Sequence, residues 1–411
     1  MDPPAPDQPA PEANPPAEPG PGRPAEPGGG ALAGLLVADF SRVLAGPLAT
    51  MFLGDLGATV VKVERPQTGD DTRGWGPPFV GDEAAYYLSV NRNKRSVELD
   101  LGDEVDRGRA FRLAAAADVL VENFRPGTLE RFGLGYGDVS AANPGVVYCT
   151  ISGFGTGAGA GVAGYDFVAQ AIGGVMSVTG PAGGPPYKAG VAVADILTGL
   201  HAAVGIEAAL LERSSSGRGQ RVEVDLLSSV LSSMVNLAAG FLNGGGVPRA
   251  VGNAHPSIAP YEAVATADRP LVIAVGNDAQ FAALCGVLGC PELAADRRFA
   301  TNRDRVEHRA ALMALLEEHL GTRTAAEWVA VLRSANVACG PVNALDAAFA
   351  DAESFGLAAS VEQRRPGQPA VRTVANPIRL GRTPAAYRRP PPALGADNAE
   401  LFDWLDRLGG G

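Results

Sequence analysis

The apolar positions of residues 35–64 follow the order strand, helix, strand. LLVADF (35–40) and ATVVKVE (58–64) are short apolar runs typical of buried strands. Between them, apolar side chains recur every fourth residue, as on one face of a helix, at Leu44, Leu48, Phe52 and Leu56. Strand, helix and strand within about 30 residues form a βαβ unit, so we expect two parallel strands here.

The same alternation continues as far as residue 226. Further strands are expected at 96–101, 118–124, 146–152 and 221–226, and helices at 103–117, 166–178 and 195–213. Apolar strands separated by helices are typical of a parallel sheet that helices cover on both faces. We therefore predict an α/β fold whose large domain has a Rossmann-like parallel sheet.

After residue 245 the pattern becomes that of an α+β domain. YEAVAT (261–266) and LVIAVG (271–276), separated by turn residues, predict an antiparallel hairpin. Helical patterns follow at 278–289, 303–320 and 324–335. We therefore expect a second, smaller α+β domain, then short apolar pieces and a last helix near 397–408.

Residues 1–30 differ in composition from the rest of the chain. They hold eleven Pro and five Gly but no aromatic residue, Val, Ile or Leu. Because this segment has nothing to bury, we expect a disordered Pro/Gly/Ala-rich tail. It lacks the apolar core of a secretory signal, and its five acidic residues and single Arg are unlike a mitochondrial presequence.

The longest uncharged apolar stretch is 226–242, which contains four Ser and one Asn. We interpret it as a buried helix of a soluble protein rather than as a membrane span. With no targeting segment and no span expected, the predicted location is cytoplasmic, without a membrane partner.

The chain of 411 residues is acidic, with a formal net charge of −11. Its overall field repels phosphate, which argues against a nucleic-acid partner but leaves room for a local basic pocket. Four scattered cysteines, none in CxxC, predict neither a disulfide framework nor a metal site. The absence of HExxH, GxSxG and Walker sequences excludes zincins, serine hydrolases and P-loop enzymes.

Asp166 follows a glycine-rich segment and opens a helical pattern. One interpretation is a helix N-cap that accepts backbone N–H groups. The other is a nucleophile in a water-poor cleft, since helix N-terminal N–H groups stabilise a carboxylate. The preceding glycines would let backbone N–H groups approach an oxyanion. A GxGxxG match at 159–164 lacks the acidic residue that a dinucleotide site needs about 20 positions later.

Cations stand near several strand ends of this acidic chain, at Arg65, Arg92, Lys94, Arg95, Arg125 and Arg131. They are either ligands of phosphate groups or solvated surface charges. Phe124 either stacks on a base or belongs to the core. Among the four histidines, His255 in the loop GNAHPS is the one that we place near a site.

Six segments together carry a family resemblance: VLAGPLATMFLGDLGATVVKVE, NRNKRSVELDL, VLVENFRPG, GYDFVAQAIGG, GRGQRVEVDL and ACGPV. In this combination, from about residue 32 to the C-terminus, the chain resembles the family III CoA-transferases. That group includes formyl-CoA:oxalate and carnitine CoA-transferases and the α-methylacyl-CoA racemases.

The resemblance implies that Asp166 is a catalytic nucleophile. It also implies a CoA site at Leu44, Ala45, Arg65, Leu99, Asn123, Phe124, Arg125 and Arg131. Leu44 stands where some members have a polar residue. Gly244, Gly245 and Gly246 are candidates for the family's mobile glycine loop or, alternatively, a flexible linker; with His255 they form the expected acyl-site loop.

The resemblance also implies an intertwined homodimer. In such members the large domain combines the N-terminal part, here 31–228, with the C-terminal part, here 338–411. The small domain then comprises residues 229–337 with its linkers.

The implied activity is that of an acyl-CoA:carboxylate CoA-transferase. CoA would move from an acyl-CoA to a small carboxylic acid through an aspartyl anhydride and an aspartyl-CoA thioester at Asp166. The CoA thioester is then a substrate, and no permanently bound cofactor is expected. The alternatives are an α-methylacyl-CoA racemase, which exchanges an α-proton between two groups, and an inactive CoA-ester-binding protein. Racemases tend to have a histidine where Tyr165 stands, and no histidine precedes His201.

Overall fold

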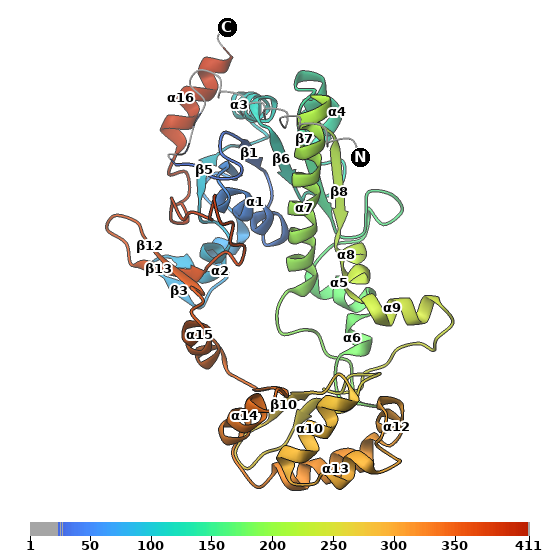
Figure 1. Ribbon diagram of the computed structural model, residues 1–411. Coiled ribbons are helices and arrows are strands. Elements are labelled where there is room, and N and C mark those ends of the chain that lie inside the picture. Colours follow the sequence, from blue (N-terminus) through green and yellow to red (C-terminus); the bar gives the residue numbers. More distant parts are fainter. Residues whose placement is uncertain (1–23, 25, 27, 410–411) are drawn as a thin grey trace, which may run out of the picture. The chain divides into compact units, whose positions relative to one another are not determined.

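The computed structural model describes residues 24, 26 and 28–409, which form two compact units (Figure 1). Unit 1 comprises the described residues up to Asp166, Ala194–Ser229 and the described residues from Ser360 onward. Unit 2 comprises Phe167–Val193 and Val230–Ala359. The units differ from the predicted domains in two places, because 167–193 and 338–359 belong with the smaller unit.

Unit 1 is built on a six-stranded parallel sheet, which confirms the predicted α/β fold. Its spatial order is β5-β2-β1-β6-β7-β8. The strands are β1 (Leu36–Asp39), β2 (Thr59–Glu64), β5 (Lys94–Glu98), β6 (Val119–Glu122), β7 (Val147–Ser152) and β8 (Arg221–Asp225). Because the chain proceeds from β1 to one side and returns to β6 on the other, the strand order reverses between β1 and β6.

Helices cover both faces of this sheet (Figure 1). One face packs on α3 (Glu104–Ala116), α4 (Tyr136–Ala142) and α16 (Asn398–Leu408). The other packs on α1 (Ala45–Asp55) and α7 (Val193–Ser216). Successive side chains of a strand point to opposite faces, so Leu36 and Ala38 enter the first core and Val37 enters the second. This alternation explains why β1, β6 and β7 are mostly apolar at successive positions.

Shorter elements complete unit 1. They are the one-turn helices η1 (Asp71–Gly74) and η2 (Glu130–Phe132), helix α2 (Ala85–Ser89), and the small hairpins β3 (Phe79–Val80)–β4 (Glu83–Ala84) and β12 (Ser360–Arg364)–β13 (Ala370–Val374). The C-terminal segment returns to unit 1, where Asp397 accepts the backbone N–H of Ser96 at 2.9 Å.

Unit 2 contains an antiparallel sheet of three strands in the order β11-β10-β9, including the predicted hairpin. The strands are β9 (Tyr261–Val264), β10 (Leu271–Ala274) and β11 (Ala338–Pro341). The helices packed with them are α10 (Asp278–Leu288), α11 (Glu292–Ala295), α12 (Asn302–Glu307), α13 (Arg309–Leu320) and α14 (Ala325–Ser334). Helices α6 (Val175–Val178), α9 (Val235–Leu242) and α15 (Leu345–Ser354) also belong to this unit, and α5 (Asp166–Ile172) and α8 (Leu226–Ser233) join the two.

Three predicted helices are interrupted. The stretch 226–242 forms α8 and α9 rather than one buried helix, with a break at Met234 and a positive φ at Val235, and α9 has no buried residue. The prediction of a single buried helix was therefore wrong. The 166–178 pattern divides at Gly173 and Gly174, and 303–320 divides at His308.

Most of the predicted tail lies outside the described residues, but its end has a definite place. Glu26 accepts from Arg95 Nε at 2.9 Å and from Arg389 Nε at 2.8 Å. The described part of residues 24–30 is therefore fastened to unit 1 by ion pairs that composition did not reveal.

Candidate functional site

Asp166, the first residue of α5, lies at the N-terminal end of α7. Its Oδ1 accepts the backbone N–H of Ala194 at 2.8 Å and, more weakly, that of Asp195 at 3.4 Å. These N–H groups precede the first hydrogen bonds inside α7, so they are available to a carboxylate. Half-buried and held by these N–H groups, Asp166 has a fixed orientation, which suits both interpretations offered for it.

A cavity of about 210 Å³ adjoins this carboxylate. Its walls come from loops that follow β1, β6 and β7, together with Tyr165 and Asp195, the neighbours of Asp166 in sequence and in space. Asp166 itself is not among the lining residues. The loops after β1 and β6 meet where the strand order reverses, which is the usual ligand position in open parallel sheets.

A second cavity of about 310 Å³ lies at the same sheet edge, lined by loops after β1, β2, β5 and β6. The two cavities share two lining residues, Arg42 and Phe124. The Arg42 guanidinium carbon lies 5.3 Å from the centre of the Phe124 ring. A cation and an aromatic ring therefore stand where the two cavities meet.

Seven of the eight positions predicted for a CoA site line these cavities. Leu44, Ala45, Asn123 and Arg125 line the first, Arg65 and Leu99 line the second, and Phe124 lines both. Arg131, on η2, lines neither and is exposed, although Phe132 beside it lines the second.

Asn123 acts on the backbone as well as facing the cavity. Its Oδ1 accepts the N–H of Arg42 at 2.8 Å, and its Nδ2 donates to the carbonyl of Arg42 at 2.7 Å. The amide thus fixes the loop after β1 from the loop after β6. Beyond Arg42, the N–H groups of Leu44 and Ala45 at the start of α1 donate to none of the residues that the structure describes. They therefore offer an anion two donors at the wall of the first cavity.

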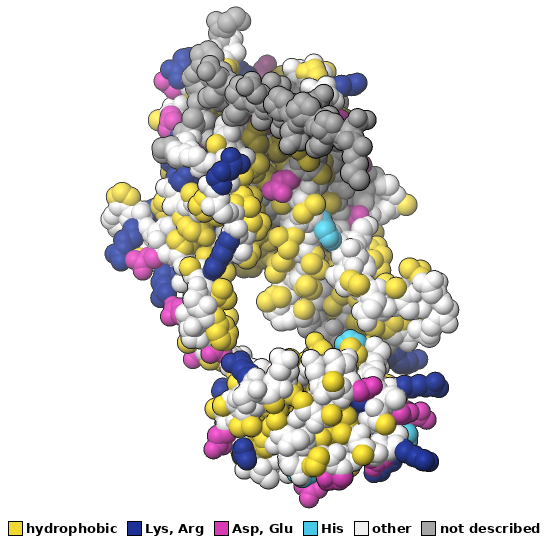
Figure 2. Space-filling view, in the orientation of Figure 1, with side chains coloured by type: hydrophobic (Ala, Val, Ile, Leu, Met, Phe, Trp, Pro, Cys, Tyr) yellow, Lys and Arg dark blue, Asp and Glu magenta, His cyan; other side chains and the backbone are white. Residues whose placement is uncertain are grey.

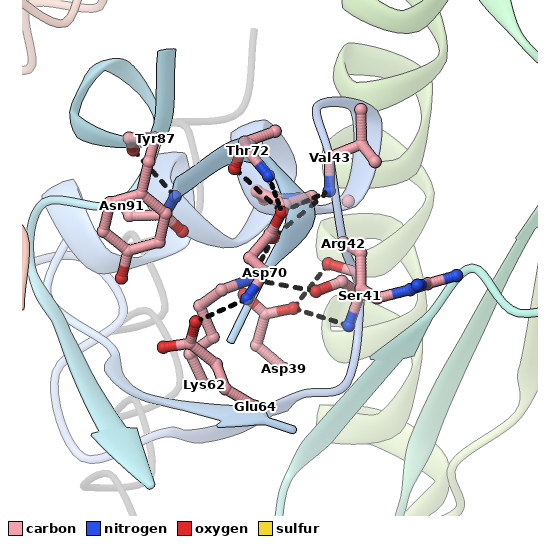
Figure 3. A network of polar contacts seen from close by, with 12 residues as sticks. Asp39, Ser41, Arg42, Val43, Lys62, Glu64, Asp70, Thr72, Tyr87 and Asn91 are labelled. Atoms are coloured by element: carbon pink, nitrogen blue, oxygen red, sulfur yellow. Dashed lines mark hydrogen bonds and ion pairs between the residues drawn. The ribbon is translucent and has the colours of Figure 1, made fainter. Parts of the chain in front are cut away.

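Buried charged side chains contact the loops that line these cavities (Figure 3). Lys62 pairs with Asp70 at 2.9 Å and Lys94 with Asp39 at 3.0 Å, and all four side chains are fully buried. Burial by itself would raise the pKa of Asp39, but Lys94 and Lys62 outweigh it and lower that pKa to about 2. Asp39 is therefore ionised at physiological pH, whereas burial outweighs the attraction of Asp39 and lowers the pKa of Lys94 to about 8.

The cluster Arg92, Lys94 and Arg95 was interpreted either as a functional basic spot or as solvated strand-end charges. The structure contradicts the solvated alternative, because all three side chains are buried. Arg92 binds Asp55 with two nitrogens, and Arg95 pairs with Glu26. Neither Arg92, Lys94 nor Arg95 lines either cavity.

Asp195 is the titratable residue of the first cavity that sequence reasoning missed. Burial and the neighbouring charge of Asp166 raise the pKa of Asp195 to about 7. Its carboxyl group makes no hydrogen bond or ion pair with the described part of the chain. Arg42, Asp71 and Trp75 were also missed, since their places depend on contacts between loops that are far apart in sequence.

The predicted acyl-site loop belongs to unit 2. Gly244, Gly245 and Gly246 follow α9, and the N–H groups of the first two donate to Phe241 and Gly240. The rings of His255 and Tyr261 are in contact at a tilt of 54°, with their centres 5.2 Å apart, and His255 Nδ1 accepts the N–H of Ser257 at 3.2 Å. Within the described chain, no group of three or more His, Cys, Asp or Glu side chains is arranged to hold a metal ion.

The sequence is similar to several characterised enzymes. Succinyl-CoA:glutarate CoA-transferase of Mus musculus is 42% identical over 372 residues, which cover 90% of this chain and 85% of the mouse protein. Succinate–glutarate CoA-transferase of Agrobacterium fabrum is 41% identical over 384 residues, covering 92% and 96% of the two chains. Acetyl-CoA:oxalate CoA-transferase of Acetobacter aceti is 42% identical over 315 residues, covering 76% and 81%.

Comparison with solved structures agrees with the comparison of sequences. The crystal structure of a CAIB/BAIF family protein from Brucella suis superposes with a TM-score of 0.83 at 42% identity, covering 92% of this chain and all of that chain. The profile of CoA-transferase family III matches residues 32–398. These matches confirm the resemblance inferred from six sequence segments: the chain belongs to CoA-transferase family III.

Proposed function

We propose that this protein transfers CoA from an acyl-CoA to a free dicarboxylic acid, with Asp166 as the covalent nucleophile. As a family member it is an acyl-CoA:carboxylate CoA-transferase. The observation that carries the proposal is the carboxylate of Asp166, held by the N–H of Ala194 beside a cavity that contains most of the expected CoA positions.

In the first half-reaction, a carboxylate oxygen of Asp166 attacks the thioester carbonyl carbon. The C–S bond breaks, CoA leaves as the thiolate, and an acyl-aspartyl anhydride remains. The thiolate then attacks the carbonyl carbon of Asp166, forming an aspartyl-CoA thioester and releasing the donor acid as its carboxylate. A carboxylate nucleophile suits this step, because only an anhydride keeps both carbonyl groups activated.

The second half-reaction reverses these steps with the acceptor. The acceptor carboxylate attacks the aspartyl-CoA thioester, the thiolate leaves, and a new anhydride forms. The thiolate then attacks the acceptor's carbonyl carbon, which yields the new acyl-CoA and regenerates the Asp166 carboxylate. No net proton transfer is required.

Each attack creates an oxyanion that needs hydrogen-bond donors. We assign this role to the loop of Gly244, Gly245 and Gly246. The N–H of Gly246 donates to none of the described residues, in contrast to those of Gly244 and Gly245. Gly246 is therefore the donor of this loop that is available to a reaction intermediate.

A dicarboxylate is the proposed acid for two reasons. The similar enzymes are named for succinyl, glutarate and oxalate substrates. In addition, Arg42 and Arg125 line the first cavity, and an Arg guanidinium suits a second carboxylate group.

We also propose a homodimer in the cytoplasm. Helix α7 packs one face in the core of unit 1 and leaves Leu200, Val204 and Leu211 39%, 65% and 73% exposed. Figure 2 shows apolar side chains gathered over this helix. Helix α7 is long and apolar enough to span a membrane, but the core helix of a soluble protein can have the same length and composition. A second copy of the chain would cover this face.

The test is a panel of acyl-CoA donors and free acids, with products identified by mass spectrometry. We expect CoA to appear on a dicarboxylic acid when succinyl-CoA is the donor. Multi-angle light scattering measures the dimer in the same preparation. If no donor and acid pair gave transfer, although the protein bound CoA, the inactive CoA-ester-binding protein would be the correct interpretation.

A further inference from the structure

We propose that Asp70 is a positioning residue for CoA binding, because its buried carboxylate holds the backbone of Val43 in the left-handed conformation that places Leu44 and Ala45 at the first cavity. The inference rests on the proposed function, in that the cavity is taken to receive the CoA ester. Asp70 lines the second cavity but not the first, and it acts on the first cavity through the loop after β1.

Asp70 joins three segments of the chain at one carboxylate (Figure 3). The N–H of Val43 donates to its two oxygens at 3.3 and 3.2 Å. The N–H and hydroxyl of Thr72 donate at 3.0 and 2.8 Å, and Lys62 Nζ donates at 2.9 Å. The residue is 1% exposed, so water does not replace these donors.

The Val43 backbone needs such support. Its φ is 69°, in the region that L-residues avoid and that is least favourable for a β-branched side chain. Without a specific contact the loop would relax towards ordinary φ values. The N–H groups of Leu44 and Ala45 directly follow this residue, so relaxation would redirect both of them.

Other hydrogen bonds hold the backbone of this loop at Ser41 and Arg42, but they do not reach Val43. Lys62 Nζ donates to the carbonyl of Ser41 at 2.9 Å, and Asn123 binds both backbone groups of Arg42. Of the described residues, only Asp70 accepts the N–H of Val43. The left-handed residue is thus held by one side chain.

The Asp70 carboxylate stays ionised in these surroundings. Burial acts to raise its pKa, but Lys62 and the Thr72 N–H outweigh burial and hold that pKa below its usual range. Asp70 therefore remains an acceptor throughout the physiological pH range, and the loop keeps its conformation without any switch.

The experiment compares CoA binding and kinetics in the full-length protein. Free CoA is titrated calorimetrically into the wild type, Asp70→Ala, and the double variant Asp70→Ala/Val43→Gly. Alanine has no acceptor for the Val43 N–H, so we expect Asp70→Ala to weaken CoA binding by roughly tenfold, the factor that corresponds to the cost of an unsupported left-handed residue. KM for the acyl-CoA should rise by a similar factor, with kcat changed less.

Glycine adopts positive φ without this cost, so Val43→Gly should restore much of the lost CoA affinity in the Asp70→Ala background. A residue that merely stabilised the whole fold would show no such rescue. Ser96→Ala is the matched control, since it removes a 2.7 Å bond to Glu64 in the same buried region but leaves the Asp70–Val43 contact intact. We expect its CoA affinity to stay near that of the wild type.

A measurement on the wild type avoids dependence on the variant's folding. Hydrogen exchange should find the Val43 N–H protected, because it donates to a buried carboxylate. Rapid exchange there, an unchanged CoA affinity in Asp70→Ala, or a failure of Val43→Gly to restore binding would each overturn the proposal. If the wild type bound no CoA, the proposed function would fail, and that outcome is distinct from normal wild-type binding with no effect of Asp70→Ala.

Discussion

The N–H of Ala194 donates to Asp166 Oδ1 at 2.8 Å, although 28 residues separate the two in sequence. The contact ties the first residue of α5 to the first turn of α7. It restricts the rotation of the Asp166 carboxylate. A nucleophile held in this way approaches a thioester from one direction.

Replacing Asp166 should therefore remove transfer. We expect Asp166→Ala and Asp166→Asn to lower kcat by about three to six orders of magnitude, because neither side chain can form an anhydride. The Asn variant keeps an oxygen for the Ala194 N–H and should match the wild type in thermal stability. Hydroxylamine added with acyl-CoA should modify Asp166 in the native protein. Substantial turnover by either variant would remove Asp166 from the mechanism.

Arg65 lines the second cavity and has a long, exposed contact of 3.4 Å with Asp71. A charge-assisted bond to a CoA phosphate contributes about 1.5–3 kcal/mol. Arg65→Ala should thus raise KM for CoA esters roughly ten- to hundredfold, with KM for the free acid unchanged. Arg131→Ala tests the same role at an exposed position. Equal effects on both substrates would indicate a folding defect instead.

Transfer, rather than racemization, should account for the turnover. Inverting a carbon next to a thioester needs two proton-transferring groups, and Tyr165 stands where racemases tend to have a histidine. The protein is incubated with a chiral 2-methylacyl-CoA in deuterated water, without an acceptor acid. We expect no deuterium at the α-carbon; incorporation at the rate of turnover would contradict transfer as the function.

The pKa of Asp195, raised from 3.8 to about 7, predicts a pH-dependent stability. The folded state keeps the proton that the unfolded chain loses near pH 4, so ionisation of Asp195 opposes folding as the pH rises towards 7. Asp195→Asn should therefore gain stability relative to the wild type between pH 4 and 7, and keep that gain above pH 7. Glu122, whose pKa burial also raises to about 7, is common to both proteins and cancels in the comparison.

Thermal unfolding of both proteins at several pH values measures this difference. The two melting temperatures should differ least at pH 4 and most at pH 8. A difference that stayed constant over this range would show that Asp195 does not titrate between these values.

The buried pair of Arg92 and Asp55 predicts a large effect on folding. Arg92 Nε and Nη2 lie 2.9 and 2.7 Å from the two Asp55 oxygens. Asp55→Ala leaves the guanidinium buried without its counter-charge and should lower the free energy of unfolding by about 3–5 kcal/mol in urea titrations. Asp403→Ala, which breaks a solvent-exposed pair with Arg407, is the control and should change it by less than about 1 kcal/mol. Similar effects of both substitutions would contradict the assignment.

Local sequence was enough to identify the large sheet. Strands buried on both faces are mostly apolar at successive positions, so β2 and β6 stand out as Val-rich runs, although Lys62, Glu64 and Glu122 within them are charged and buried. Asp166 also followed from a local pattern, a glycine-rich segment before a helix. Seven of the CoA positions that the family resemblance implies line the two cavities, because they follow strands whose ends meet at one sheet edge; their contact with CoA stays a prediction.

Long-range contacts account for what sequence reasoning missed. The burial of Arg92, Lys94 and Arg95 depends on carboxylates from distant segments, and a short run of cations looks the same whether it faces water or such partners. In the sequence, Asp70 is an ordinary loop residue. Only the fold places its carboxylate against the N–H of Val43, 27 residues earlier. In the sequence, Asp195 is an ordinary residue in the first turn of a helix. Only the fold places it beside Asp166. The protonation and the backbone conformation of a residue depend on all of the groups around it. Most of those groups come from segments tens of residues away in the sequence, so only folding brings them together.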